Sequence, residues 1–71
     1  MLQIEKIEDF THENLTDLYS REHYFLCKIG NYTFVSDLGF GDDLGFYVDC
    51  HRAKMVFPVV ELEEFYLIVE K

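Results

Sequence analysis

The chain has 71 residues, which is enough for one domain, and we expect a single domain over residues 1–71. Fourteen Asp and Glu residues against six Lys and Arg residues give a formal net charge of −8. Since nucleic-acid backbones are bound by clustered cations, this charge balance argues against direct nucleic-acid binding. The excess of acidic residues either keeps the protein soluble or forms a surface that binds a basic surface of another molecule.

Hydrophobic residues are abundant for so short a chain. Hydrophobic residues make up 49% of it, including seven Phe and five Tyr. A domain of this size buries only about 60% of its unfolded surface, and each aromatic ring can bury roughly 150–250 Å². Some rings are therefore expected at the surface, where a contiguous apolar patch marks an interface with a partner or in a homodimer.

The first third of the chain predicts a strand and then a helix. Leu2 and Ile4 alternate weakly with polar residues, which indicates an edge strand. Phe10, Thr11 and Leu15 match a hydrophobic staple with Thr11 as the helix N-cap. The predicted helix has an apolar face of Leu15, Leu18 and Tyr19 and a polar face of Glu13, Asp17 and Arg21. This pattern is typical of a short amphipathic helix packed on an apolar layer.

From Tyr24 onward the apolar pattern has a period of two, which predicts β-strands. Gly30-Asn31 stands between two apolar runs and suits a type II′ hairpin turn. That turn fixes the pairs Ile29 with Tyr32, Cys27 with Phe34, and Phe25 with Ser36, which we expect to form a core face.

Three further segments complete the predicted sheet. Phe46–His51 alternates and turns Phe46, Val48 and Cys50 inward. Pro58 lacks an N–H and predicts a sheet edge or a strand end. The closing strand, Phe65–Glu70, is apolar on both faces, which indicates a central strand or an interface.

The order of elements from Tyr24 to Val69 resembles the small SH3-like barrels of bacterial and phage proteins. The resemblance consists of the hairpin YFLCKIGNYTFVSDL, a Gly-rich acidic connection, the strand GFYVDC, and a Phe-Pro pair before the last strand. The resemblance implies a strongly bent antiparallel sheet, and together with the helix predicted from the residues before it we expect an α+β fold: one short N-terminal amphipathic helix on a bent sheet of five to six strands. The chain has no Trp, so the resemblance does not imply recognition of proline-rich peptides.

The segment SDLGFGDDLGF, Ser36 to Phe46, contains the tetrapeptide Asp-Leu-Gly-Phe twice. Its glycines and aspartates favour turns, and we expect Ser36–Gly45 to be a connection between strands. It lacks the closing Glu of an EF-hand, so no calcium site is expected. Phe40 and Leu44 stand among acids, where they contact a partner, or Phe40 folds back over the core.

The chain carries no motif of catalytic quality. Cys27 and Cys50 fall on predicted core faces, where thiols are inert. His51 and Asp49 supply only two zinc ligands without the usual spacing, and no phosphate-binding loop is present. We expect no enzyme activity, no cofactor and no metal. Reduced thiols, with neither a signal peptide nor a long apolar run, predict a cytoplasmic protein that does not bind membranes.

These features predict a small acidic protein-binding module, an inhibitor or regulator of the phage or mobile-element type. It would occupy a basic surface of a partner protein, including one that binds nucleic acid. The candidate partner-binding residues are Asp37, Phe40, Asp42, Asp43, Leu44, Glu61, Glu63, Glu64 and Tyr66. The alternative is a structural or regulatory subunit of a bacterial assembly, or a homodimer. Its apolar face would comprise Tyr24, Leu26, Val56, Val60, Tyr66 and Ile68. A metal-dependent or thiol enzyme ranks last.

Overall fold

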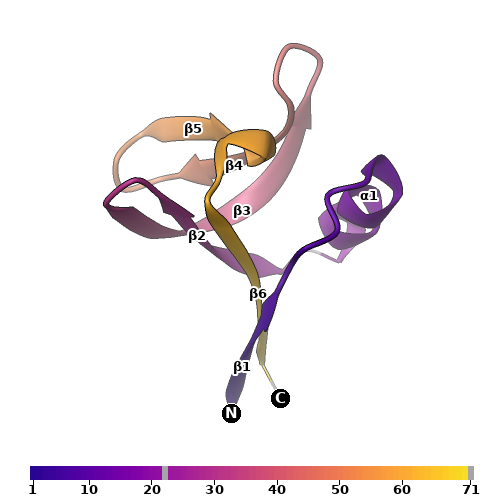
Figure 1. Ribbon diagram of the computed structural model, residues 1–71, viewed down its shortest axis with the longest axis vertical. Helices are drawn as coiled ribbons and strands as arrows, with labels where there is room; N and C mark the ends of the chain where they lie inside the picture. Colours follow the sequence, from indigo (N-terminus) through magenta and orange to yellow (C-terminus); the bar gives the residue numbers. More distant parts are fainter. Residues whose placement is uncertain (22, 71) are drawn as a thin grey trace.

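The computed structural model describes residues 1–21 and 23–70 and shows one α-helix, one short 3-10 helix and one six-stranded antiparallel sheet (Figure 1). The elements are β1 (Leu2–Lys6), α1 (His12–Ser20), β2 (Tyr24–Ile29), β3 (Tyr32–Gly41), β4 (Gly45–Cys50), β5 (Met55–Pro58), the 3-10 helix η1 (Val59–Glu61) and β6 (Glu64–Glu70). The strand order is β1-β6-β2-β3-β4-β5. The predicted α+β class and strand number are confirmed.

The helix is not N-terminal, which corrects the prediction. β1 precedes it and pairs with β6 along its whole length, from Leu2 opposite Glu70 to Lys6 opposite Tyr66. α1 is therefore the connection between β1 and β2, and the two chain ends lie side by side (Figure 1). β6 has β1 on one side and β2 on the other, so its two apolar faces belong to a central strand, as the sequence indicated.

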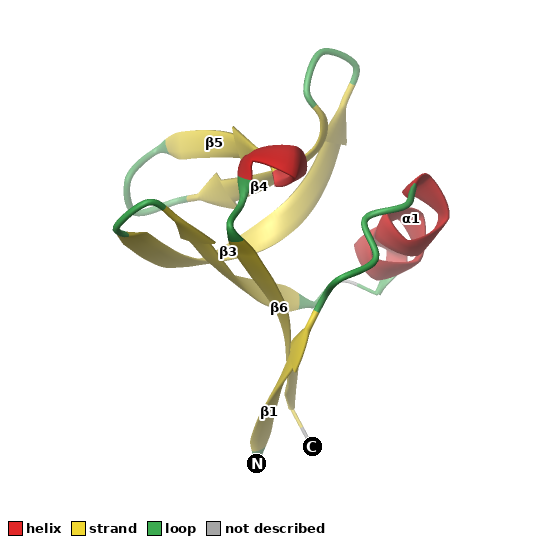
Figure 2. Cartoon of the chain, viewed as in Figure 1, coloured by secondary structure: helices red, strands yellow, loops and turns green. Residues whose placement is uncertain are grey.

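The sheet bends at β3 because this ten-residue strand changes partner halfway along (Figure 2). Its first half, up to Ser36, pairs with β2, and its second half, from Asp37, pairs with β4. Within residues 1–21 and 23–70, β1 and β5 each have one sheet neighbour, so the sheet is open rather than closed. Pro58 ends β5 at this edge, as predicted.

The predicted connection at Ser36–Gly45 is wrong for most of its length. β3 continues through Gly41, and only Asp42–Leu44 forms a turn. Glycine weakens a strand because it has no side chain to pack, but here a neighbour supplies the missing contact. A Cβ added at Gly39 would lie 2.5 Å from the Cζ atom of Tyr47, whose ring covers this part of the strand.

The core lies between the inner face of the sheet, α1 and η1. The predicted β2–β3 register is confirmed, including Cys27 opposite Phe34 and Phe25 opposite Ser36. The buried residues are Ile7, Leu15, Leu18, Phe25, Cys27, Phe34, Ser36, Val48, Cys50, Val59, Phe65 and Leu67. At the turn, Gly30 has a φ of 57° and Asn31 has a negative φ, as a type II′ turn requires.

α1 begins as the sequence predicts. The Thr11 hydroxyl accepts a hydrogen bond from the Asn14 N–H at 3.3 Å, which satisfies one of the free donors of the first turn. Phe10 stacks against Phe65 with ring centroids 6.2 Å apart and thereby ties the helix entry to the core. Tyr19 was predicted to share the packed face, but it is about half exposed and lies beside the β3–β4 hairpin.

Candidate functional site

The repeated tetrapeptide forms the β3–β4 hairpin. One copy lies on β3 and the second runs through the turn into β4, so that Phe40 and Phe46 face each other across the strands. Their ring centroids are 4.8 Å apart in an edge-to-face arrangement, which is a favourable geometry for aromatic pairs. Gly45 follows the three-residue turn with a φ of 69°, as the residue after such a turn commonly does.

This backbone requirement makes a testable prediction. Replacing Gly45 by alanine should lower the free energy of unfolding by about 1–2 kcal/mol, since a side chain disfavours the left-handed region. Gly41→Ala is the matched control, because its added Cβ would meet the Tyr47 ring at an ordinary 3.7 Å and its φ is not positive. Urea denaturation of both variants decides the matter. Equal destabilisation would contradict the role assigned to φ.

A groove lies between the hairpin and α1. It is lined by His12, Thr16, Tyr19, Phe40 and Phe46 and has a volume of about 310 Å³. The helix supplies the first three residues, at the spacing that places side chains on one helix face. The centroid of the His12 ring lies 5.3 Å from that of Phe46 and 6.2 Å from that of Phe40. The ring centroids of Tyr19 and Phe46 are 6.5 Å apart. We call these five residues the aromatic groove.

The sequence left open whether Phe40 packs on its own chain or stays available to a partner, and the structure combines the two. It packs against Phe46 and His12, yet 48% of its surface stays exposed to solvent. Leu44 is similarly exposed at the hairpin tip. The groove is therefore an apolar surface that the fold builds and leaves uncovered within the described residues.

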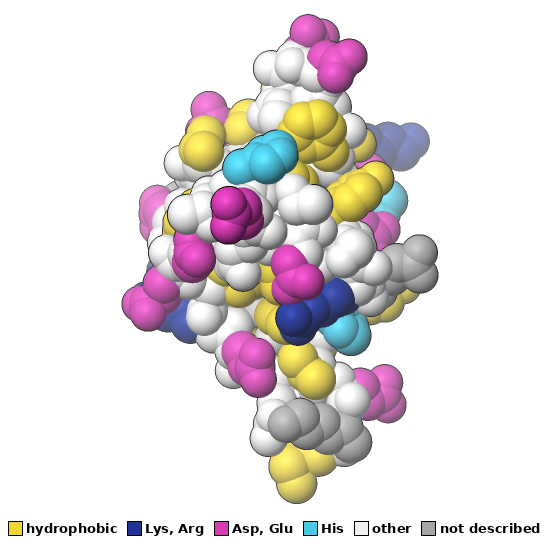
Figure 3. Space-filling view, turned by 90° about the vertical axis from the view of Figure 1, so that its right-hand side faces the viewer, with side chains coloured by type: hydrophobic (Ala, Val, Ile, Leu, Met, Phe, Trp, Pro, Cys, Tyr) yellow, Lys and Arg dark blue, Asp and Glu magenta, His cyan; other side chains and the backbone are white. Residues whose placement is uncertain are grey.

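The hairpin tip is acidic. Asp42 and Asp43 are exposed, and neither forms an ion pair or a hydrogen bond with any described residue. Figure 3 shows acidic side chains at one end of the molecule with hydrophobic and histidine side chains next to them. Acidic residues elsewhere do form ion pairs: Asp17 pairs with Arg21 at 2.7 Å, and Glu64 pairs with Lys28 at 3.4 Å.

The other predicted partner-binding residues do not join the tip. Glu63 binds the turn between β2 and β3 through a hydrogen bond from the Gly30 N–H to its carboxylate at 3.0 Å. The Tyr66 hydroxyl donates a hydrogen bond to Glu64. This bond, together with the Lys28 ammonium, lowers the pKa of Glu64. Glu61 lies exposed on η1. The structure thus separates these four residues from the hairpin tip, and three of them, Glu63, Glu64 and Tyr66, form contacts within or between strands and their turns.

Asp37 also belongs elsewhere, in a cluster with His51. Asp37 and Asp49 face each other across β3 and β4, and like charges in this position destabilise a sheet. The His51 Nε2 atom lies 3.0 Å from Asp37, and its Nδ1 atom lies 3.5 Å from Asp49. The hydrogen bond with Asp37 and the charge of Asp49 raise the pKa of His51 above 6.5. Sequence reasoning placed His51 beside Asp49 and missed Asp37.

The raised pKa of His51 predicts a pH-dependent contribution to stability. The contribution should be complete below pH 6.5, where the ring is protonated in both the folded and unfolded states, and should be lost as pH rises through the folded pKa. The difference in unfolding free energy between wild type and His51→Gln should therefore become smaller as the pH rises through the folded pKa of His51. An NMR titration should place the His51 midpoint above 6.5 and lower it in Asp37→Asn. An unchanged midpoint in that variant would contradict the assignment.

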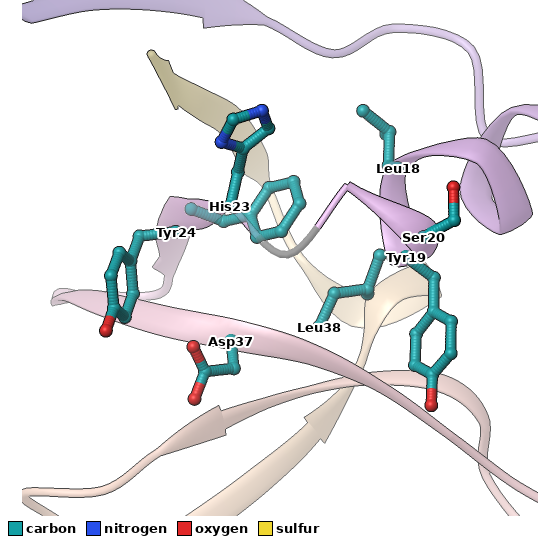
Figure 4. A pocket seen from close by; sticks show the side chains of 8 residues that line it. Leu18, Tyr19, Ser20, His23, Tyr24, Asp37 and Leu38 are labelled. Carbon is teal, nitrogen blue, oxygen red and sulfur yellow. The ribbon is translucent and has the colours of Figure 1, made fainter. Parts of the chain in front are cut away.

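A second cavity, of about 390 Å³, lies between the end of α1 and strands β2 and β3 (Figure 4). His23, Ser20 and Asp37 line it. The Ser20 hydroxyl donates a hydrogen bond to the Asp17 carbonyl at 2.7 Å, and Asp37 is held by His51. Two of the three polar side chains named here, Ser20 and Asp37, are therefore bound to partners outside the cavity.

Both cysteines are free and buried, on the core faces that the sequence predicts. The Cys27 sulfur lies 3.1 Å from the Ser36 hydroxyl. Burial raises the pKa of the Cys27 thiol to about 11, although the hydrogen bond with Ser36 acts in the opposite direction. Since the thiolate is the reactive species, Cys27 is protected at neutral pH.

Residues 1–21 and 23–70 contain no group of three or more His, Cys, Asp and Glu side chains placed to hold a metal ion. Their α-helix has nine residues, which is too short to cross a membrane.

The second apolar face predicted from the sequence is only partly assembled. Tyr24, Leu26, Tyr66 and Ile68 lie together on the outer face of the sheet. Val60 is on η1, away from them. The register adds two residues that sequence reasoning missed, Ile4 on β1 and Val35 on β3. Their alternation with polar neighbours was the available signal.

No protein-family model matches this chain, and neither the curated proteins nor the solved structures contain a significant match to it. The resemblance to SH3-like barrels therefore stays a prediction.

Proposed function

We propose that this chain is a small acidic protein-binding module that inhibits or regulates a partner by occupying a basic surface, as phage and mobile-element inhibitors do. One observation carries the proposal. The β3–β4 hairpin places two unpaired carboxylates, Asp42 and Asp43, next to exposed aromatic rings. A surface of this composition is suited to a partner that offers cationic side chains.

The aromatic groove provides short-range recognition. A cation over an aromatic face gains about 0.5–1 kcal/mol at an exposed site and about 2 kcal/mol when desolvated. The rings of Phe40 and Phe46 both line the groove, and Asp42 and Asp43 supply negative charge on the turn between them. An arginine side chain fits both features, because its planar guanidinium stacks on rings and pairs with carboxylates.

The net charge provides long-range attraction. At −8 for 71 residues, the chain carries a negative potential that accelerates encounter with a basic partner. Where the partner's basic surface binds nucleic acid, the carboxylates take the place of phosphates. The binding of such a module would then compete with nucleic acid.

The fold is proposed to be an open variant of the SH3-like small barrel, supported by the bent sheet and by the order of strands from β2 to β6. The free, buried cysteines are consistent with the proposed cytoplasmic location, where thiols stay reduced.

The test compares immobilised wild-type protein with an Asp42→Lys/Asp43→Lys variant. Host lysate and an arginine-rich peptide serve as the two sources of ligand. Wild type should retain a basic protein and the peptide at low salt and release both as salt screens the attraction, whereas the variant should retain neither.

A Glu5→Lys/Glu8→Lys variant is the matched control. It has the same net charge as the hairpin variant, but its changes lie at exposed positions on β1 and before α1. It should bind nearly as wild type does. Equal losses in both variants would mean that net charge alone, and not the hairpin, attracts the partner.

The second candidate function is a structural or regulatory subunit of a bacterial assembly. It is favoured by the four predicted apolar residues that share the outer sheet face, Tyr24, Leu26, Tyr66 and Ile68. A larger complex held there would resist salt, because apolar contacts are not screened.

A further inference from the structure

The two faces of the sheet formed by β1, β6, β2 and β3 are both apolar. In a single domain, an antiparallel sheet normally packs one face on the core and exposes polar residues on the other. Here the inner face carries core residues such as Phe25 and Phe65. The outer face carries Ile4, Tyr24, Leu26, Val35, Tyr66 and Ile68. We call these six residues the outer patch.

The strand registers make the outer patch continuous. Ile68 has Ile4 on one side and Tyr24 on the other, which forms one row across three strands. In the next row, Leu26 lies between Tyr66 and Val35. Directly opposed residues have their Cβ atoms about 4.5–5.5 Å apart, so each row is in lateral contact.

The patch is open to solvent. Tyr24 is 62% exposed, and Ile4 and Val35 are each more than half exposed. The helix buries Leu15 and Leu18 in the core, and η1 buries Val59 there, so both pack on the inner side. No described element covers the outer side. Apolar patches of this kind mark interaction surfaces.

The charges around the outer patch distinguish it from the rest of the molecule. Lys6 and Lys28 lie at the end of the patch beside Tyr66 and Leu26. Asp37 and Glu70 lie toward its other end. The carboxylate of Glu64 offsets the charge of Lys28, 3.4 Å away, so Lys6 supplies the excess positive charge at this end. At the other end, Asp37 is paired with His51, and Glu70 supplies the excess negative charge. This face therefore has a basic end and an acidic end.

We infer that the outer patch is a self-association surface, on which a second copy of this chain packs face to face. A two-fold axis across the strands would place the lysine end of one copy against the acidic end of the other, which is the self-complementarity that an isologous interface needs. A uniformly basic partner would instead be repelled by the excess positive charge at the Lys6 end of the patch. The charge distribution thus favours a second copy over other occupants.

This dimer is independent of the proposed function. The hairpin tip and the aromatic groove lie outside the patch, so both copies would keep them free. A dimer would present two hairpins, which increases the affinity for a partner with two matching basic sites without new contacts. A dimer that binds no basic partner, and a monomer that binds one, are both distinguishable outcomes.

The test measures the mass of the full chain by sedimentation equilibrium over a concentration series. Wild type should have twice the 8.5 kDa mass of the chain. Tyr24→Glu and Val35→Glu place a carboxylate in the patch at exposed positions and should each shift the mass to that of one chain. Val60→Glu, at an apolar residue that is 85% exposed on η1, is the matched control and should stay dimeric.

Circular dichroism with urea denaturation confirms that each variant is folded. A monomeric wild type at every concentration would overturn the inference, as would a dimer that survives both patch variants. Dissociation by Val60→Glu as well would place the interface elsewhere. Raising the salt concentration should leave the wild-type dimer largely intact, since its centre is apolar, and full dissociation by salt would also contradict the inference.

Discussion

Replacing Phe25 by alanine is expected to remove about 3–5 kcal/mol of stability, as is usual for a buried Phe. Phe25 is 1% exposed, and its ring stacks on Phe65 with centroids 4.9 Å apart. At roughly 0.05–0.15 kcal/mol per residue, a domain of this size has a total stability of only about 4–10 kcal/mol. The variant should therefore be largely unfolded or close to it, with a strongly lowered urea midpoint.

Phe40→Ala is the matched control for this prediction. It makes the same substitution at a ring that is 48% exposed and that contacts mainly Phe46 and His12. The expected loss is about 1 kcal/mol, the value of an aromatic pair at a partly exposed site. If Phe40→Ala cost as much as Phe25→Ala, the hairpin would belong to the core and the aromatic groove would not be a surface.

Local chemistry explains what the sequence predicted correctly. The Gly30-Asn31 turn and the period-two pattern around it fixed the β2–β3 register residue by residue. The N-cap at Thr11 is likewise decided within four residues. Such features depend on backbone preferences and on neighbours close in the chain, so a single sequence contains the information they need.

The wrong prediction that spans the most residues, the connection at Ser36–Gly45, has a cause that is distant in the sequence. Gly39 and Gly41 favour a turn when they are read by themselves, and the sequence indicated a connection there. In the structure the ring of Tyr47, on the opposite strand, packs against both positions and stabilises β3 through Gly41. Strand preference depends on such cross-strand packing more than on the residue itself.

In the candidate site, too, the residues that are neighbours in the chain were predicted, and those brought together only by the fold were not. Phe40, Asp42, Asp43 and Leu44 were predicted together and stay together, because they are neighbours in the chain. The helical side of the groove, His12, Thr16 and Tyr19, was missed. Their spacing of four and three residues placed them on one helix face, but only the fold shows that this face meets the hairpin.

Phe40→Ala is also expected to weaken partner binding by at least about tenfold, even though the variant stays folded. Rings at the centre of an interface often contribute more than 1 kcal/mol when truncated, and about 1.4 kcal/mol corresponds to a factor of ten in affinity. Phe40 is the more exposed ring of the Phe40–Phe46 pair, with 48% of its surface open to solvent, so it is the ring that a bound cation would contact. The arginine-rich peptide, titrated by NMR or calorimetry, gives the measurement, and Val60→Ala is the control.

The salt dependence separates the two parts of the proposed mechanism. Asp42→Lys/Asp43→Lys should act mainly through charge, so its effect should be largest at low salt and diminish as salt is added. Removal of the Phe40 ring takes away a short-range contact, so the fold-change in affinity should stay nearly constant over the same range. If the Phe40→Ala effect disappeared with the charges screened, the aromatic groove would contribute no recognition of its own, and the hairpin would attract its partner by charge alone.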